Sequence, residues 1–349
     1  MEILDLVKHG VLNQASDIHI TVGVPPVFRV NGELRLYGES VLQPDDTKSL
    51  VKDVLDEEQL LELEKVGEVD TSFSSPGVGR FRVNAYKQRG SYCMALRIIP
   101  LRIPSMEELG VPQVVKELSR LPRGLILVTG PTGSGKSTTL ASIIDLINQE
   151  RNLHIITLED PIEYLHKHNN SIVNQREIGI DSQSFSSALR AALRQDPDVI
   201  LVGEMRDLET MSIALTAAET GHLVLSTLHT IGASKTIDRI IDVFPSHQQQ
   251  QIRIQFASVI QGIISQQLLP TVDEKSRIAA FEIMVSTPAI RNLIREEKSH
   301  QIDTAIQTGG KHGMVTMDSS IINLYNRGLI SMDTALNAAI NMELMKKYI

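Results

Sequence analysis

The first hundred residues alternate between hydrophobic and polar positions with the two-residue period of β-strands. Residues 17–22 alternate in this way, and residues 27–30 run into an Asn-Gly pair that is typical of a tight hairpin turn. Residues 79–89 and 91–99 predict two longer strands joined by a turn at Gly90. We therefore expect residues 1–98 to form a small α+β domain.

A different pattern begins after a proline-bounded segment at residues 99–105, which we interpret as a linker because two prolines stiffen it and block helix. Beyond it, short and continuously apolar runs alternate with helix-compatible segments, which is typical of a parallel sheet buried on both faces. These runs are residues 125–129, 154–158, 198–202 and 223–227. The pattern predicts an α/β domain over residues 106–349.

Four other stretches have the spacing of apolar residues expected of helices. They are residues 45–65, about 106–120, 246–269 and 318–347. The last two predict a helical cap at the C-terminal end.

The composition limits the function classes that fit. The chain has 349 residues, enough for two domains at about 150 residues each. Its 34 basic and 42 acidic residues give a net charge of −8, so no nucleic-acid partner is expected. The single cysteine, Cys93, excludes an intramolecular disulfide and a cysteine-cluster zinc site, and fits a reducing cytoplasm. No apolar stretch is long enough to predict a membrane-spanning helix, so any work at a membrane goes through partners.

The strongest motif matches the phosphate-binding pattern G-x-x-x-x-G-K-[ST], with an apolar strand before it and a helix-compatible segment after it. Glycines let backbone N–H groups close around phosphate oxygens, and the following helix N-terminus adds partial positive charge. We expect Lys136 to reach the β- and γ-phosphates and the Ser137 hydroxyl to bind Mg²⁺. The candidate ATP-binding residues are Gly130, Pro131, Thr132, Gly133, Ser134, Gly135, Lys136, Ser137 and Thr138.

Carboxylates after two other apolar runs indicate hydrolysis of that nucleotide. GTP-specific motifs are absent from the sequence, which favours ATP. Glu204 follows the run 198–202 and is placed near the Mg²⁺ site at the carboxyl end of a strand. Glu159 and Glu163 follow the run 154–158. One of these acids should activate the attacking water, and spacing alone does not choose among them.

Histidines and arginines complete the candidate set. His229 follows the apolar run 223–227, where a hydrogen bond to the γ-phosphate is feasible, and His222 precedes that run. Phosphoryl-transfer charge is often neutralised by an arginine from another domain or subunit. Arg82 and Arg97 fall on adjoining predicted strands of the N-terminal domain, with Arg80 nearby. The alternative for these arginines is an ordinary solvated strand face.

Four segments together resemble the Walker A, Asp box, Walker B and His box of the secretion/type IV pilus ATPase (GspE/PilT) family. They are residues 130–138, 158–163, 203–207 and 226–230. The resemblance covers essentially the whole chain. Within the family, the short length and one further motif resemble the pilus retraction ATPases rather than the longer assembly and secretion ATPases. That motif is Ala289, Ile290, Arg291, Asn292, Leu293 and Ile294.

This resemblance implies a PAS-like N-terminal domain, a RecA-like ATPase domain and a ring of six subunits with ATP and Mg²⁺ at the subunit boundaries. It implies Glu163 as the general base and Glu204 as the acid that supports Mg²⁺, often through water. Arg82 and Arg97 match the arginines that approach the γ-phosphate, and Arg80 can share or replace one of those roles.

The resemblance also implies a place in the cell. The ring would sit in the cytoplasm at the inner face of the cytoplasmic membrane, act on a PilC-like platform protein and drive pilin subunits back into the membrane. In residues 289–294, helical spacing predicts a buried face from Ala289, Ile290, Leu293 and Ile294. Arg291 and Asn292 lie on the other face and are candidates for partner contact.

Three alternatives stay open from the sequence. A PilU-like accessory subunit would bind nucleotide but hydrolyse it slowly, and the retraction motif speaks against it. An assembly or secretion ATPase would use the same chemistry. A nucleic-acid translocase would need a basic pore hidden within an acidic chain.

Overall fold

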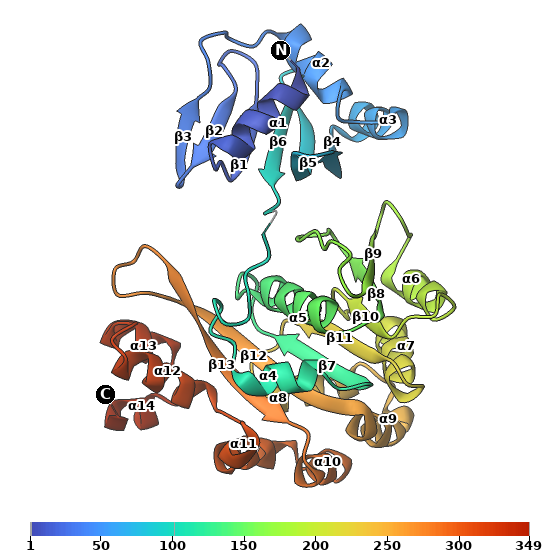
Figure 1. Cartoon of the computed structure of the whole chain (residues 1–349), viewed down its shortest axis with the longest axis vertical. Coiled ribbons are helices and arrows are strands. Elements are labelled where there is room, and N and C mark those ends of the chain that lie inside the picture. The colour runs from blue at the N-terminus through green and yellow to red at the C-terminus, as the bar shows by residue number, and fades with distance from the viewer. Residues whose placement is uncertain (1, 101, 349) are drawn as a thin grey trace. The chain divides into compact units, whose positions relative to one another are not determined.

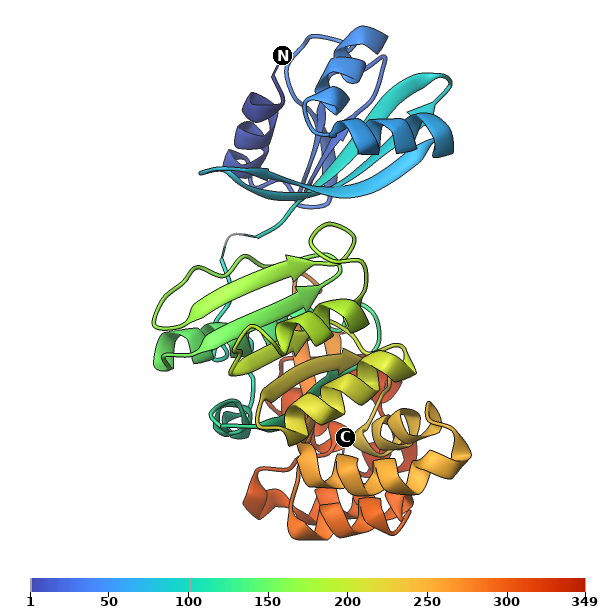
Figure 2. The same cartoon turned by 90° about the vertical axis from the view of Figure 1, so that its right-hand side faces the viewer.

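The computed structural model describes residues 2–100 and 102–348, which form two compact units. One unit runs to Arg102 and includes the short segment Glu163–Leu165, and the other unit holds the rest of the chain. Figure 1 and Figure 2 show the elements of each unit.

The N-terminal unit is a six-stranded antiparallel sheet with three helices. Its strand order is β3-β2-β1-β6-β5-β4. The strands are β1 (Asp17–Ile20), β2 (Val27–Val30), β3 (Glu33–Leu36), β4 (Glu68–Ser75), β5 (Gly79–Gln88) and β6 (Ser91–Ile98). The helices are α1 (Ile3–Leu12), α2 (Pro44–Lys52) and α3 (Glu57–Val66). Apolar residues of the helices and of one sheet face share one core, which leaves the other face polar.

The predicted hairpins are confirmed. Asn31 and Gly32 have φ angles of 52° and 84°, so both central turn residues adopt the positive φ that this turn requires. The predicted helix over residues 45–65 is wrong as a single element, because α2 ends and α3 begins within it. Asp56 starts the new helix: its Oδ1 accepts a hydrogen bond from the Gln59 backbone at 2.9 Å, and the Gln59 side chain accepts one in return. Strand β4 and helix α1 were not predicted.

The second unit is built on a seven-stranded sheet in the order β13-β12-β7-β11-β10-β8-β9. All neighbouring strands are parallel except β12 and β13, which form an antiparallel pair. The strands are β7 (Gly124–Thr129), β8 (His154–Glu159), β9 (Ile172–Glu177), β10 (Val199–Val202), β11 (Leu223–Leu228), β12 (Ile260–Pro270) and β13 (Arg277–Val285). The parallel strands predicted from the four apolar runs are confirmed.

Helices cover both faces of this sheet. On one face, α4 (Gln113–Ser119) and α5 (Lys136–Glu150) pack on alternate residues of the central strands. On the other face pack α6 (Phe185–Ala192), α7 (Leu208–Glu219), α8 (Ala233–Asp242), α9 (Ser246–Val259), α10 (Pro288–Arg295) and α11 (Ile302–Thr308). The two hydrophobic cores explain the continuously apolar runs, because each central strand is buried on both faces.

The helix predicted over residues 246–269 is wrong in its second half. Helix α9 ends at Val259, and the chain continues directly as β12, which pairs with β7 and with the unpredicted strand β13. Ile263 and Ile264 point into opposite cores, so the strand is needed by the packing on both faces. Gly262 allows α4 to approach closely, because a Cβ there would lie 2.6 Å from the Leu118 Cδ1.

The chain ends in helices, as predicted, but residues 318–347 form three of them rather than one. They are α12 (Met317–Asn326), α13 (Met332–Ala338) and α14 (Met342–Tyr348), drawn in red in Figure 1. The buried Asp318 carboxylate of α12 holds the segment between α13 and α14 in place. It accepts hydrogen bonds from the Ile340 and Asn341 backbones at 2.7 and 2.9 Å. In the described part of the chain, no helix has the length and apolarity needed to span a membrane.

Candidate active site

One edge of the second sheet gathers most of the predicted site. Strands β7, β8, β10, β11 and β12 run in the same direction, so the loops that follow them meet at their carboxyl ends. Thr129 of β7 lies beside Leu228 of β11 and Ser265 of β12. The phosphate-binding motif therefore starts in the middle of the sheet, between the loop that carries His229 and the second half of β12.

The loop of residues 130–135 has the backbone that the motif requires. Gly130, Gly133 and Gly135 have φ angles of 145°, 78° and 89°, which side-chain-bearing residues rarely adopt. A Cβ at Gly130 would lie 2.3 Å from the Gln266 backbone oxygen, so there is no room for one. The buried Ser134 Oγ has no hydrogen-bond partner among the described residues. The loop thus has the backbone of a phosphate cradle, with an unpartnered hydroxyl beneath it.

Lys136 begins α5 and folds back over this loop. Its Nζ donates hydrogen bonds of 3.0 Å to the Gly130 and Pro131 backbone oxygens. The ammonium group and the N-terminus of a fifteen-residue helix therefore place positive charge at the same point. Ser137, in the first turn of α5, is exposed. This arrangement can bind the phosphates of a nucleotide.

Glu204 and His229 come together at the ends of β10 and β11. The Glu204 Oε2 lies 3.5 Å from the His229 Nε2 and 2.7 Å from the Arg206 Nε. The two strand ends are fixed to each other, since the Thr227 hydroxyl donates to the Gly203 backbone oxygen at 2.6 Å. A carboxylate, an imidazole and a guanidinium thus share the edge of the sheet with the phosphate loop. Arg206 was not singled out from the sequence, although it lies within the Walker B segment.

The carboxylates after β8 have different surroundings. Glu159 accepts hydrogen bonds from the Thr157 hydroxyl at 2.6 Å and from the Gln175 amide at 3.1 Å, so it takes part in the packing of β8 and β9. Glu163 is exposed, in the segment that groups with the N-terminal unit. The residue before Glu163 is held in place by β9, because the buried Glu177 carboxylate accepts a 3.0 Å hydrogen bond from the Ile162 backbone. Glu177 was not singled out from the sequence, because β9 was not predicted.

The fold of the chain does not bring His222 to this edge. It precedes β11, whereas the phosphate loop and His229 follow the carboxyl ends of β7 and β11. Its Nδ1 lies 2.9 Å from the Ala217 backbone oxygen at the end of α7. The length of β11 therefore separates His222 from His229, and its side-chain contacts are with the end of the preceding helix.

The N-terminal unit places its arginines on the polar face of its sheet. Arg82 and Arg97 are directly opposite each other on β5 and β6, as predicted from the turn between these strands. The Arg97 Nε donates a 3.0 Å hydrogen bond to the Asp17 carboxylate. Arg80 donates to the hydroxyls of Ser72 and Ser74. Arg82 and Arg97 remain exposed, so both present positive charge to solvent.

Helix α10 carries the motif of residues 289–294. Ile290 and Ile294 are fully buried and Leu293 is half-buried, as predicted, but Ala289 is exposed, so that part of the predicted buried face is wrong. Arg291 is anchored rather than free, because its Nε donates to the Ser286 hydroxyl at 3.0 Å and its Nη2 to the Gln261 Oε1 at 3.4 Å. Asn292 is exposed.

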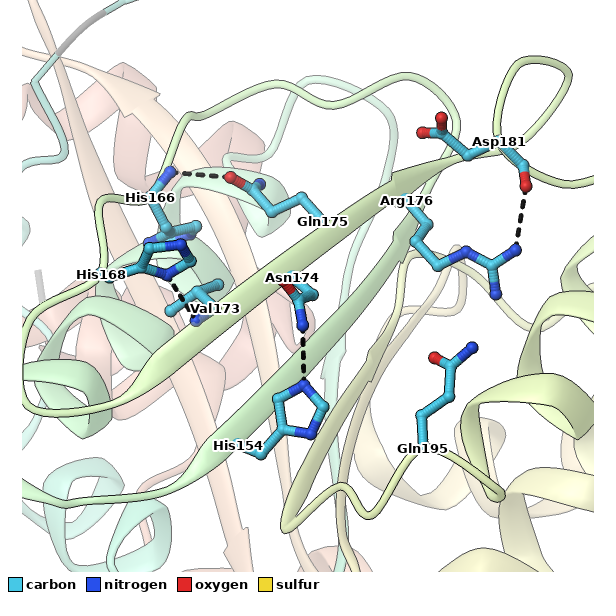
Figure 3. Close-up of a pocket in the computed structure, with 9 residues that line it drawn as sticks. All are labelled: His154, His166, His168, Val173, Asn174, Gln175, Arg176, Asp181 and Gln195. Atoms are coloured by element: carbon cyan, nitrogen blue, oxygen red, sulfur yellow. Dashed lines mark hydrogen bonds between the residues drawn. The ribbon is translucent and has the colours of Figure 1, made fainter.

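A separate polar groove of about 740 Å³ lies beside the edge strand β9 (Figure 3). It is lined by His154, His166, His168, Val173, Asn174, Gln175, Arg176, Asp181 and Gln195. Burial lowers the pKa of His166 to about 4, so this imidazole is neutral at pH 7. The described residues contain no cluster of histidines, cysteines or carboxylates that could hold a metal ion. None of the residues predicted for catalysis lines this groove.

Comparison with known proteins agrees with this geometry. The sequence model of the family described as "Type II/IV secretion system protein" matches residues 3–284. The chain is 50% identical to the type IV pilus retraction ATPase PilT of Pseudomonas aeruginosa, over 97% of this chain and 98% of that protein. It is 46% identical to a twitching motility protein of Neisseria gonorrhoeae, over 98% of this chain and 92% of that protein.

A solved structure shows the same fold. The crystal structure of the pilus retraction motor PilT with bound ADP is similar to this chain with a TM-score of 0.93 and 50% sequence identity. The match covers 99% of both chains.

Proposed function

Because the chain belongs to the type II/IV secretion system protein family, we propose that it is an ATPase that powers type IV pilus retraction. The observation that carries the proposal is the meeting of the phosphate loop, Glu204 and His229 at one edge of a parallel sheet. The identity to retraction and twitching proteins over nearly the whole chain supports the direction of the work.

The cradle fits a nucleotide with Mg²⁺. The glycine backbone and Lys136 bind the β- and γ-phosphates, and the unpartnered Ser134 hydroxyl is available to a phosphate oxygen. The Ser137 hydroxyl and the Glu204 carboxylate are the hard oxygen donors that Mg²⁺ prefers, and Glu204 acts directly or through water. Bound Mg²⁺ neutralises the charge that develops on the phosphates during transfer.

Water activation is assigned to Glu163. Its carboxylate is exposed, whereas Glu159 is engaged with Thr157 and Gln175, and Glu204 faces His229 and Arg206. Glu163 takes the proton of the attacking water as a general base. His229 donates a hydrogen bond to the γ-phosphate, which links the presence of that phosphate to the position of Glu204.

Charge neutralisation in the transition state is assigned to Arg82 and Arg97, with Arg80 in a supporting role. Six subunits form a ring, and these arginines act on the nucleotide held by a neighbouring subunit. Hydrolysis then rotates the N-terminal unit against the ATPase unit around the linker of residues 99–105, which converts nucleotide state into motion.

The ring works at the cytoplasmic face of the inner membrane, where a PilC-like platform protein receives the motion. A PilU-like paralogue is a further partner. Neither partner requires this chain to enter the bilayer.

The proposed function is tested by a variant that is expected to keep ATP hydrolysis and to lose pilus retraction. We expect the purified chain to hydrolyse ATP with Mg²⁺, and Arg291→Ala to keep turnover within about twofold, because Arg291 binds only Ser286 and Gln261 among the described residues. In the bacterium that encodes the chain, the same variant is expected to stop twitching. Phosphate release and colony spreading are the two measurements, and Arg295→Ala, at an exposed position on the same helix, is the control.

A chain that does not hydrolyse ATP would contradict the proposed function. A variant whose turnover and twitching fall together would contradict the separate role of Arg291.

A further inference from the structure

Gln266 lies directly beneath the phosphate loop. It is on β12, and its side chain is almost completely buried, with 3% of the residue exposed. Its Oε1 accepts a 2.7 Å hydrogen bond from the buried hydroxyl of Thr139 in the first turns of α5. This bond ties β12 to the helix whose N-terminus receives the phosphates, across 127 residues of sequence.

The same residue contacts both ends of the loop. A Cβ at Gly130 would lie 2.3 Å from the Gln266 backbone oxygen, and a Cβ at Gly135 would lie 2.8 Å from the Gln266 Nε2. Main chain and side chain of Gln266 therefore fill the space directly under the first and last glycines of the cradle. A side chain at either position would collide with Gln266, and both φ angles are positive, so this close approach depends on glycine at both ends of the loop.

The Gln266 amide is oriented by its single hydrogen bond. Thr139 occupies the oxygen end, which turns the NH₂ group toward Gly135. The NH₂ group donates no hydrogen bond within the described residues, yet it is not sealed off from solvent as the Ser134 hydroxyl is. This uncommitted donor is therefore available to the loop or to its ligand.

The neighbouring residue supports a second loop of the site. The Ser265 Oγ accepts a 2.9 Å hydrogen bond from the Gly232 backbone, three residues after His229. Consecutive residues of β12 thus hold the phosphate loop on one face of the sheet and the loop after β11 on the other.

We propose that Gln266 is a positioning residue of the nucleotide site, which holds the loop of residues 130–135 and the first turns of α5 in the shape that phosphates require. The proposal rests on the proposed nucleotide binding. Without this support the loop amides are less well ordered before binding, so nucleotide affinity falls. Since the loop holds the phosphates in the ground state and the transition state alike, the loss appears in KM rather than in kcat.

The test compares Gln266→Leu and Thr139→Val with Gln267→Leu. Gln267 is the matched control, because it is the next residue on β12, is half-buried and makes no side-chain hydrogen bond within the described residues. We expect Gln266→Leu and Thr139→Val each to raise the Kd of ADP about tenfold, as expected for one lost interaction, and the double variant to bind no more weakly than the weaker single variant. Gln267→Leu should bind ADP within about twofold of the original chain.

The readouts are ADP calorimetry, thermal unfolding of the nucleotide-free protein, and KM and kcat for ATP. Wild-type affinity in both Gln266→Leu and Thr139→Val would overturn the proposal, and so would a fall in kcat at unchanged KM. If Gln266→Leu does not fold, Thr139→Val decides alone, since it only replaces a hydroxyl by a methyl group. Failure of the original chain to bind ADP would overturn the proposed function instead.

Discussion

Lys136→Ala is expected to lower the rate of ATP hydrolysis by roughly 10²–10³-fold at saturating nucleotide. The ammonium group already lies over the phosphate loop, 3.0 Å from two of its carbonyl oxygens, so little rearrangement is needed for it to reach phosphate oxygens. No other lysine lies in the segments that form the site. Phosphate release at several ATP concentrations measures the effect.

The control for this variant is Lys311→Ala, which removes the same charge from an exposed position in the C-terminal half. It should leave turnover unchanged within about twofold. A Lys136→Ala protein that keeps more than a tenth of the original rate would contradict the assignment of residues 130–137 as the phosphate site.

Glu163→Gln is expected to lower turnover by roughly 10²–10⁴-fold, the usual contribution of a general base. Glutamine keeps the size of the side chain and removes only its ability to take a proton. Binding of ADP should be unaffected, because no base is needed for binding. Single-turnover hydrolysis and ADP calorimetry on the same preparation separate the two effects.

Glu159→Gln is the matched comparison for Glu163→Gln. A glutamine at residue 159 can still accept the hydrogen bond from the Thr157 hydroxyl, so its turnover should fall far less. The opposite order of the two effects would move the general base to Glu159 and contradict the role given to Glu163.

The sheet that carries the site was predictable because its strands lie between two cores. Double burial makes runs such as 125–129 and 223–227 continuously apolar, and this pattern is visible in a single sequence. The phosphate loop was predictable for a different reason. Its glycines and Lys136 lie within one short segment, residues 130–136, whose shape depends on local backbone geometry.

Strand β12 was not predictable in the same way. Its apolar residues follow α9 without a turn residue between them, and a short apolar run fits a helix as well as a strand. Gln266 was missed for this reason, because its importance comes from its position next to β7. The position of His222 was also hidden, because only strand direction shows that it lies at the opposite end of β11 from His229.

The break between α2 and α3 did leave a signal in the sequence. Asp56 and Gln59 have the spacing of a capping box, which marks a helix start within the apparently continuous pattern of residues 45–65. The apolar spacing on both sides of the break concealed it.

We propose that one subunit holds the nucleotide and a neighbouring subunit supplies the arginines. The most direct measurement is Mg²⁺-ATP turnover against protein concentration for the original chain, Lys136→Ala, Arg82→Ala and an equal mixture of the two variants. We predict that turnover per subunit rises with concentration and that the mixture is more active than either variant alone, because each variant retains the half that the other lacks. Turnover that is independent of concentration, together with an inactive mixture, would contradict a site shared between two subunits.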